Sequence, residues 1–193
     1  MEERVTIKMD KARPEAGKDS VVLKDREVKD REELYLFYKT TITHTFRNNG
    51  IEDPSGINNE VNQQMDTFDR GEDILTARLN GRIVGTIAFG RQNKSVSGNL
   101  PPEMENLPEI KGVYVHPDYQ SRGIGSLLWK SIITRLHYRN VSRACLDSGY
   151  RQAQRYWKEK IGKPDIVMKD YWGPGEDQMI WFLQIENLYK GLL

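Results

Sequence analysis

The chain has 193 residues, of which 37% are hydrophobic and 30% charged, with 29 basic and 28 acidic residues. This length suits one domain with a substantial core, and the near-zero net charge argues against a nucleic-acid partner, which usually needs a concentrated basic face. No stretch approaches the ~20 apolar residues of a membrane span, and the polar amino terminus is unlike a signal peptide. The single cysteine, Cys145, cannot form an internal disulfide, so we expect a cytoplasmic protein.

The amino-terminal part of the sequence indicates where the domain begins. Residues 1–18 are rich in charge and contain a proline and a glycine, so they predict a tail or an extra strand. The largely apolar run at residues 20–23 predicts a first strand. We therefore expect one domain over residues 19–193.

Two helices are expected next. Asp30 and Glu33 have the spacing of a capping box, in which two side chains satisfy N–H groups at the start of a helix. The apolar residues that follow predict a helix that ends at the Asn-Asn-Gly sequence of residues 48–50. A second, more polar helix is expected over residues 58–69.

A β-hairpin gives the clearest local signal. Two β-like segments, 75–79 and 83–89, flank Asn80 and Gly81. Asn-Gly is the favoured pair of a type I′ turn, because both central residues need a positive φ. The polar segment 90–108 then predicts a loop long enough to have a function.

The second half of the chain alternates strands and helices. A strand at 109–115 leads into a glycine-rich loop and an amphipathic helix, whose apolar residues recur at four-residue steps from Ile124 to Leu136. The remaining elements are expected as a strand over 141–146, a helix over 151–160, and strands over 166–168 and 179–183. This order predicts a mixed α/β fold rather than a helical bundle or an all-β fold.

The glycine-rich loop at residues 120–126 has the features of an anion site. The first N–H groups of a helix have no acceptor within it, and the helix dipole adds positive charge there. Gly123 and Gly125 allow a phosphate to approach the backbone, and Arg122 adds a permanent charge. Two better-known phosphate loops do not match. Gly125 is not followed by Lys-Ser/Thr as in a P-loop, and Leu128 stands where a dinucleotide-binding turn needs its third glycine.

The sequence around this loop resembles the GNAT superfamily of acyl-CoA-dependent N-acyltransferases. The match lies in Val-x-Val-x-Pro at residues 113–117, followed by Gln-x-x-Gly-x-Gly at residues 120–125 and an amphipathic helix. The resemblance extends from about Val21 to the last strand; an ordinary strand-to-helix turn is the alternative. It implies an α/β fold with a mixed, mostly antiparallel central sheet of about six to seven strands flanked by helices. It also implies acetyl-CoA as the acyl donor and an amine as the acceptor. The family commonly forms homodimers, although nothing in this sequence indicates one.

The resemblance also implies how the cofactor is bound. The strand at 113–115 would pair with the pantetheine arm, in an opening between this strand and the one that ends near Leu146. Backbone N–H groups of the loop would bind the pyrophosphate. The expected cofactor-binding residues are Val113, Tyr114, Val115, Gln120, Ser121, Arg122, Gly123, Ile124, Gly125, Ser126 and, from the next family motif, Trp157.

Acyl transfer to an amine also needs a general base, which can be a carboxylate. Histone-type acetyltransferases of the family carry a Glu-Ile pair ahead of the same loop, and Glu109 and Ile110 lie at the matching offset, so Glu109 is the candidate base. A glutamate at the solvent-exposed end of a strand is the alternative, and Glu103 and Glu105 are rival bases. The N–H group of Val115 is expected to contact the oxyanion.

The second motif of the family departs from its pattern here. The family carries Asn-x-x-Ala-x-x-x-Tyr, and the tyrosine often protonates the leaving thiolate. With Ala153 aligned, Tyr150 stands at the asparagine position and Trp157 at the tyrosine position. An indole N–H has no practical function as an acid, so Tyr156, about 100° away around the helix, is the remaining candidate. Packing residues are the alternative interpretation of both aromatic side chains.

The sequence contains no further grouping that points to other chemistry. No set of His, Cys and Asp has metal-ligand spacing and no activated nucleophile is apparent, so we expect no metal and a direct attack of the amine in a ternary complex. His44 is expected on a helix surface, although it is also a candidate for the lining of an acceptor pocket. We therefore expect an N-acetyltransferase that acts on a primary amine of a small molecule or a protein. The alternative is a CoA-binding sensor or interaction module without catalysis, which the missing tyrosine favours.

Overall fold

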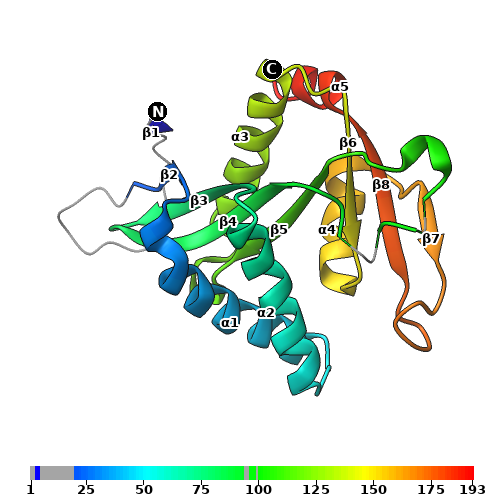
Figure 1. Ribbon diagram of the computed structural model, residues 1–193, viewed down its shortest axis with the longest axis horizontal. Coiled ribbons are helices and arrows are strands. Elements are labelled where there is room, and N and C mark those ends of the chain that lie inside the picture. Colours follow the sequence, from blue (N-terminus) through cyan, green and yellow to red (C-terminus); the bar gives the residue numbers. More distant parts are fainter. Residues whose placement is uncertain (1–2, 5–19, 94–95, 99) are drawn as a thin grey trace.

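The computed structural model describes residues 3–4, 20–93, 96–98 and 100–193, apart from the side chains of residues 3, 4 and 103. Helices and strands are arranged around one sheet (Figure 1). The strands are β1 Glu3–Arg4, β2 Val22–Asp25, β3 Asp73–Leu79, β4 Arg82–Gly90, β5 Glu109–Val115, β6 Arg143–Ser148, β7 Ile166–Met168 and β8 Gln178–Gln184. The helices are α1 Arg31–Asn48, α2 Pro54–Asp69, α3 Ile124–Tyr138, α4 Arg151–Ile161 and α5 Ile185–Lys190. Short 3-10 helices span Val28–Asp30, Pro102–Met104 and Pro117–Tyr119.

The strands of the described residues form a sheet in the order β1-β2-β3-β4-β5-β6-β8-β7. Neighbouring strands are antiparallel except β5 and β6, which run parallel. The expected mixed, mostly antiparallel sheet is therefore confirmed, and the two-residue β1 adds an eighth strand at one edge. Most of the segment 1–18 lies outside the described residues, so its division from a domain over 19–193 stays a prediction.

Helices cover both faces of the sheet (Figure 1). α1 and α2 pack on one face, where their apolar residues meet Ile74, Ile83 and Ala88. α3 packs on the opposite face of the same strands, against Leu75 and Ile87. Because successive side chains of a strand point to opposite faces, β3 and β4 supply apolar residues to both layers. α4 and α5 extend the layer of α3, and the two cores lie on the two sides of the sheet.

Several local predictions are confirmed. β3 and β4 pair around Asn80 and Gly81, whose φ values are 51° and 81°, as a type I′ turn requires. β5 spans the predicted residues, and α3 begins at Ile124. The apolar stripe of α3 is buried in the core, as its spacing indicated, through Ile124, Leu128, Ile132 and Leu136.

The predicted capping box is wrong. Asp30 precedes α1, but its carboxylate accepts the N–H of Glu27 (2.7 Å) and pairs with the guanidinium group of Arg78 (2.8 Å). Glu33 accepts the N–H of Ile83 (2.6 Å) instead of reaching back to the helix start. Both carboxylates therefore fasten α1 to the β3–β4 hairpin, and long-range contacts of this kind are invisible in local spacing.

Some element boundaries also differ from the predictions. β2 and β6 each begin two residues later than expected, because their registers against β3 and β8 decide which residues pair. α2 begins four residues earlier, at Pro54, because Asp53 caps it by accepting the N–H of Ser55 (3.0 Å). No sequence pattern predicted α5, which follows β8 directly; Tyr189 of this helix stacks on His137 of α3, with ring centroids 3.8 Å apart.

Candidate functional site

β5 and β6 separate soon after they meet. Within these two described strands, the single paired position is Glu109 with Cys145. β5 also carries an extra residue against β4 between Lys111 and Tyr114, and Gly112 there has a φ of 58°. Such a bulge bends a strand and increases its twist, so β5 turns away from β6. We term the unpaired stretch beyond Glu109 the β5–β6 opening.

One edge of β5 directs peptide groups into this opening. The N–H of His116 bonds to the carbonyl oxygen of Val84 at β4 (2.9 Å). Because peptide groups alternate in direction along a strand, those of Val113 and Val115 point away from β4 and toward β6. The Val115 carbonyl oxygen accepts the side-chain amide of Gln120 (3.1 Å). This is the arrangement that lets an extended ligand pair with a sheet edge as an additional strand.

The loop that follows β5 presents a series of backbone N–H groups. Ser121 and Gly123 have φ values of 59° and 81°, which turn the chain into α3. Among the described residues, the N–H groups from Ser121 to Ser126 have no acceptor within the protein, and the N–H of Leu127 is the first to bond, to the Gly123 carbonyl oxygen (2.9 Å). Free N–H groups at a helix start form an anion-binding site.

Side chains of the loop take different directions. Gln120 and Arg122 are exposed, and the guanidinium carbon of Arg122 lies 5.3 Å from the ring centre of Tyr119. Ile124 is 3% exposed and anchors the start of α3 in the core. The structure therefore brings the N–H groups of the loop next to the peptide groups of residues 113–115, while the Ile124 side chain serves packing.

Two aromatic residues of α4 have different surroundings. Trp157 is 4% exposed and packs against Trp129 of α3, with ring centroids 5.1 Å apart. Tyr156 is 37% exposed, and its hydroxyl group lies beside Gly125 at the start of α3. Tyr156 therefore reaches the glycine loop, whereas Trp157 belongs to the core between α3 and α4.

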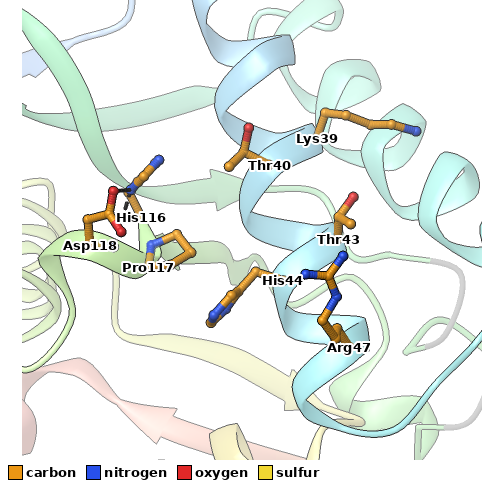
Figure 2. A pocket seen from close by; sticks show the side chains of 8 residues that line it. All are labelled: Lys39, Thr40, Thr43, His44, Arg47, His116, Pro117 and Asp118. Carbon is orange, nitrogen blue, oxygen red and sulfur yellow. Dashed lines mark hydrogen bonds and ion pairs between the residues drawn. The ribbon is translucent and has the colours of Figure 1, made fainter.

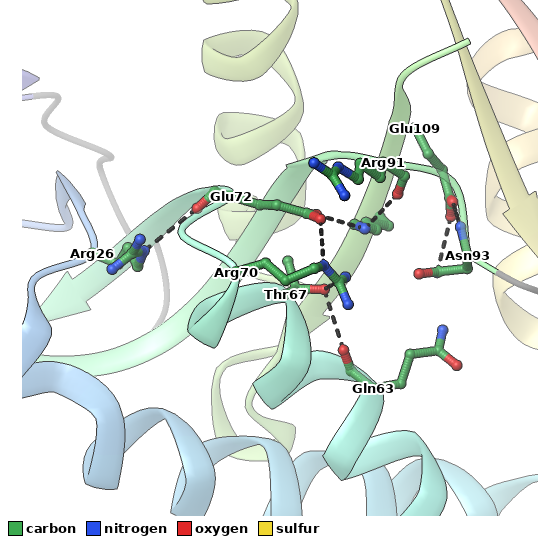
Figure 3. A network of polar contacts seen from close by, with 9 residues as sticks. Arg26, Gln63, Thr67, Arg70, Glu72, Arg91, Asn93 and Glu109 are labelled. Atoms are coloured by element: carbon green, nitrogen blue, oxygen red, sulfur yellow. Dashed lines mark hydrogen bonds and ion pairs between the residues drawn. The ribbon is translucent and has the colours of Figure 1, made fainter. Parts of the chain in front are cut away.

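Glu109 lies at the closed end of the opening and is fully buried, which excludes a solvent-exposed strand end. Its carboxyl oxygens accept the backbone N–H (2.6 Å) and the side-chain amide (3.1 Å) of Asn93 (Figure 3). It is also hydrogen-bonded to the carboxyl group of Asp147 on β6. Burial and the charge of Asp147 raise the pKa of Glu109 well above its ordinary value, although the Asn93 N–H and Lys111 oppose the shift.

Lys111, two residues further along β5, belongs to a second polar network, of which Figure 3 labels Arg70, Glu72 and Arg91. Its ammonium group lies 2.7 Å from the Glu72 carboxylate and donates to the carbonyl oxygen of Arg91 (2.6 Å). Arg70 pairs with the same carboxylate (2.7 Å). Burial raises the pKa of Glu72, but hydrogen bonds from Lys111 and Arg70 outweigh burial and hold this pKa below its ordinary value. The network ties β5 to the turn that follows α2.

The loop predicted over residues 90–108 spans residues 91–108, because β4 extends to Gly90, and it covers the closed end of the opening. Its apolar side chains pack against Cys145 and Ile180. Glu105, one of the two rival bases, is exposed on this loop. The side chain of Glu103, the other rival, lies outside the described part of the chain.

A separate pocket of about 410 Å³ lies between α1 and the segment that follows β5 (Figure 2). His44 extends from α1 toward Pro117 and lines this pocket. The sequence had offered a pocket lining as the alternative to a position on the helix surface. Lys39 and Arg47 bring positive charge to the same lining. The full lining comprises Lys39, Thr40, Thr43, His44, Arg47, His116, Pro117 and Asp118. α1 covers the face of the sheet opposite to α3, so the pocket and the helix of the glycine loop lie on opposite faces.

A family model described as the Acetyltransferase (GNAT) family matches residues 34–162, more than half of the chain. The chain belongs to the GNAT acetyltransferase family. This membership supports acyl-CoA N-acetyltransferase activity in general, with acetyl-CoA as the donor that the family uses. Among the described residues, no helix is long and apolar enough to cross a membrane, and no group of three or more His, Cys, Asp or Glu side chains is placed to hold a metal ion.

Solved structures share the GNAT fold at low sequence identity. A protein from Desulfovibrio desulfuricans, assigned to the GNAT family, has a TM-score of 0.63 and 16% identity over 86% of this chain and 99% of its own. The protein yncA of Salmonella typhimurium, solved with its cofactor acetyl-CoA, has a TM-score of 0.60 and 17% identity over 86% and 94%. The ribosomal-protein-S18-alanine N-acetyltransferase of Escherichia coli has a TM-score of 0.57 and 18% identity over 84% and 92%. No curated protein matches the sequence significantly.

Sequence interpretation missed several residues of the site. Asn93 and Asp147 reach the closed end of the opening from a loop and from another strand, so no local spacing links them to it. Gly112 did carry a signal, because a glycine inside a strand often marks a bulge. Tyr114 was expected at the cofactor, but its side chain points to the α1–α2 face and donates to Glu60 (2.7 Å), and its peptide groups point toward β4, as those of His116 do.

Proposed function

We propose that this GNAT protein transfers an acetyl group from acetyl-CoA to a primary amine of a small molecule or a protein, by direct attack in a ternary complex. The observation that carries the proposal is the continuity between the β5–β6 opening and the glycine loop. The opening offers peptide groups to an extended ligand, and the loop offers N–H groups to phosphates. CoA joins an amide-containing arm to a pyrophosphate. The arm would meet the peptide groups of the opening, and the pyrophosphate would meet the N–H groups of the loop.

The donor would be held mainly by backbone groups. Val113 and Val115 pair with the pantetheine arm, and the N–H groups of residues 121–126 bind the pyrophosphate, with Arg122 adding charge. The N–H of Gln120 already bonds to the Pro117 carbonyl oxygen (3.3 Å). Trp157 supports this surface from behind by packing α4 on α3.

The chemistry joins three events. The amine attacks the thioester carbonyl carbon, the C–N bond forms while the C–S bond breaks, and the amine nitrogen loses a proton. The carboxyl pair of Glu109 and Asp147 takes this proton. The N–H of Val115, the expected oxyanion donor, lies six residues along β5 from Glu109, so it contacts the pantetheine arm rather than the carbonyl at this pair. Burial, with the neighbouring Glu109 and Asp147 charges, raises the pKa of Cys145 to about 12, so this thiol is not an activated nucleophile. The CoA thiolate receives a proton from water or from Tyr156.

The acceptor would approach from the α1–α2 face, because α3 and the glycine loop occupy the other face. The pocket on that face contains two cationic side chains, Lys39 and Arg47, and one carboxylate, Asp118, among hydroxyl and imidazole groups. Cationic and hydrogen-bond-donating side chains bind carboxylates and phosphates. We therefore propose an acceptor that carries an acidic group near its amine.

A CoA-binding module without catalysis is the second candidate, because Trp157 stands where the family motif has its tyrosine. Incubation with acetyl-CoA and a panel of amines, with release of the CoA thiol as the readout, separates the two. The panel contains free amino acids, phosphoethanolamine and spermidine. Acceptor-dependent thiol release supports the enzyme, whereas acetyl-CoA binding without such release supports the module. A cytoplasmic location and a homodimer remain predictions, for fractionation and sizing of the purified protein to test.

A further inference from the structure

Glu109 is poorly placed to touch an acceptor. Its side chain is completely buried, and Asn93 occupies both of its carboxyl oxygens through a backbone and a side-chain donor. Its remaining recorded hydrogen-bond partner is the Asp147 carboxyl group. A proton that moves between an acceptor amine and Glu109 would therefore have to pass through Asp147.

Asp147 occupies the wall of the β5–β6 opening. It lies on β6 two residues beyond Cys145, the residue that pairs with Glu109, and the parallel strands diverge in that direction. Asp147 is partly exposed. Cys145 packs under the 91–108 loop, so Asp147, two residues on, faces the same side of the sheet. That side of the sheet is the one opposite to α3 and α4. It is also the side from which the acceptor is proposed to enter.

The burial of the two carboxyl groups indicates which of them carries the proton. Two carboxyl groups can hydrogen-bond to each other only when one of them is protonated. Burial and the charge of Asp147 raise the pKa of Glu109, which favours the proton on Glu109. Asp147 accepts the amide of Gln178 (2.5 Å), whose oxygen in turn accepts the indole N–H of Trp172 (2.8 Å). Glu109 also accepts two donors, so burial separates the pair: Glu109 is fully buried and Asp147 is partly exposed, and burial disfavours the charged form.

Other ionisable groups surround this pair without replacing either member. Lys111 on β5 lowers the pKa of Glu109, but its ammonium group is bound to Glu72. Cys145 lies beside both carboxyl groups and is held as a neutral thiol. Burial, with the charges of Glu60 and Asp147, raises the pKa of Tyr150, the residue before α4, far above its ordinary value.

We propose that Asp147 is the carboxylate that takes the proton of the acceptor amine, and that Glu109 is a positioning residue that holds Asp147 by donating a hydrogen bond to it. This inference rests on the proposed acetyl transfer. The nitrogen lone pair forms the C–N bond, the proton of the nitrogen moves to a carboxylate oxygen of Asp147, and the C–S electron pair leaves on the CoA thiolate. Asp147 then returns the proton to solvent, and the thiolate gains one from solvent.

The two carboxyl residues can be separated by matched amide substitutions. Asp147→Asn removes the base, so we expect kcat to fall by about 10²–10⁴-fold and the acidic limb of the pH–rate profile to flatten. Glu109→Gln keeps a donor to Asp147, as protonated Glu109 does, so we expect a loss below about 10-fold and a retained acidic limb. Asp69→Asn, which removes an exposed ion pair with Arg31, is the control and should behave as wild type.

Thermal unfolding of each variant establishes that it is folded, and its acetyl-CoA affinity establishes that it binds the donor. If Glu109→Gln loses as much activity as Asp147→Asn, or Asp147→Asn keeps kcat within about 3-fold of wild type, Asp147 is not the base. If Asp147→Asn does not fold, Asp147→Ala with added formate replaces it, and activity that depends on formate supports the assignment while its absence contradicts it. A wild-type protein that binds acetyl-CoA but acetylates no amine refutes the proposed function, and this inference with it, before any variant is compared.

Discussion

The two sides of the β5–β6 opening are built from different kinds of groups. The side proposed to bind the cofactor consists of backbone groups of one continuous segment, from Val113 to Ser126, fixed by a strand and by the start of α3. The side proposed to bind the acceptor consists of side chains from α1, from the segment after β5 and from β6. A site made of backbone groups tolerates many different side chains, provided that glycines permit its turns. A site made of side chains changes its ligand preference when one of those side chains is replaced. The comparison explains how one cofactor site can serve different acceptors.

The largest expected effect tests whether the cofactor side depends on the core behind it. Trp157→Ala removes an indole ring that is 4% exposed between α3 and α4, so we expect the free energy of unfolding to fall by about 3–5 kcal/mol. Urea denaturation measures this loss. Trp172→Ala is the matched control on the other side of the opening; this indole is 58% exposed and should cost no more than about 1.5 kcal/mol. Equal costs for the two variants would show that Trp157 is not a core residue.

The next prediction tests whether the glycine loop binds acetyl-CoA through its backbone groups. Gly123→Val forces a β-branched residue into a φ of 81° and places its side chain where the phosphates are expected. Calorimetry should show acetyl-CoA binding at least ~10-fold weaker, which is about 1.4 kcal/mol. Gly50→Val introduces similar strain (φ 70°) at the end of α1 and should leave this affinity unchanged. Unchanged affinity in the Gly123 variant would remove the loop from the cofactor site.

A smaller effect is expected on the acceptor side. Arg47→Gln removes one charge from the pocket on α1, so KM for an amine that carries a carboxylate or phosphate should rise about 2- to 5-fold, the range of a solvent-exposed ion pair. KM for acetyl-CoA should not change, and neither constant should change in Lys130→Gln on the exposed surface of α3. A rise in KM for acetyl-CoA alone would place the pocket on the cofactor side.

The smallest effect concerns the leaving group. Tyr156→Phe should change kcat by less than about 3-fold, because a thiol with a pKa of about 8.5, by analogy with cysteine, leaves readily without a general acid. Steady-state kinetics with saturating acetyl-CoA measures it. A drop of about 100-fold with intact acetyl-CoA affinity would make Tyr156 the general acid, and its position beside Gly125 would then be catalytic.

Features that depend on neighbouring residues could be predicted from the sequence, and features that depend on long-range contacts could not. The hairpin at Asn80 and Gly81 and the stripe of α3 depend on local spacing, and both are confirmed. The glycine loop is likewise local, and the family it indicated is the family of the chain. By contrast, Asp30 and Glu33 were read as a helix cap, whereas long-range bonds to Arg78 and Ile83 decide their positions.

The candidate site follows the same division. The position of Glu109 could be predicted from its offset to the loop, but its burial and its contact with Asp147 depend on the register of β6 and on Asn93 from the 91–108 loop. Nothing within a few residues of Asp147 marks it. Residues that meet across a sheet or under a long loop need the tertiary structure before they can be assigned a role.

A crystal structure of the protein with acetyl-CoA tests the central claim most directly. The account predicts that the peptide groups of Val113 and Val115 hydrogen-bond to the pantetheine arm between β5 and β6, and that the pyrophosphate accepts N–H groups between Ser121 and Ser126. The acetyl group should then lie near the closed end of the opening, within reach of Asp147 rather than Glu109. Acetyl-CoA bound on the α1 face, or bound without these backbone contacts, would contradict the account.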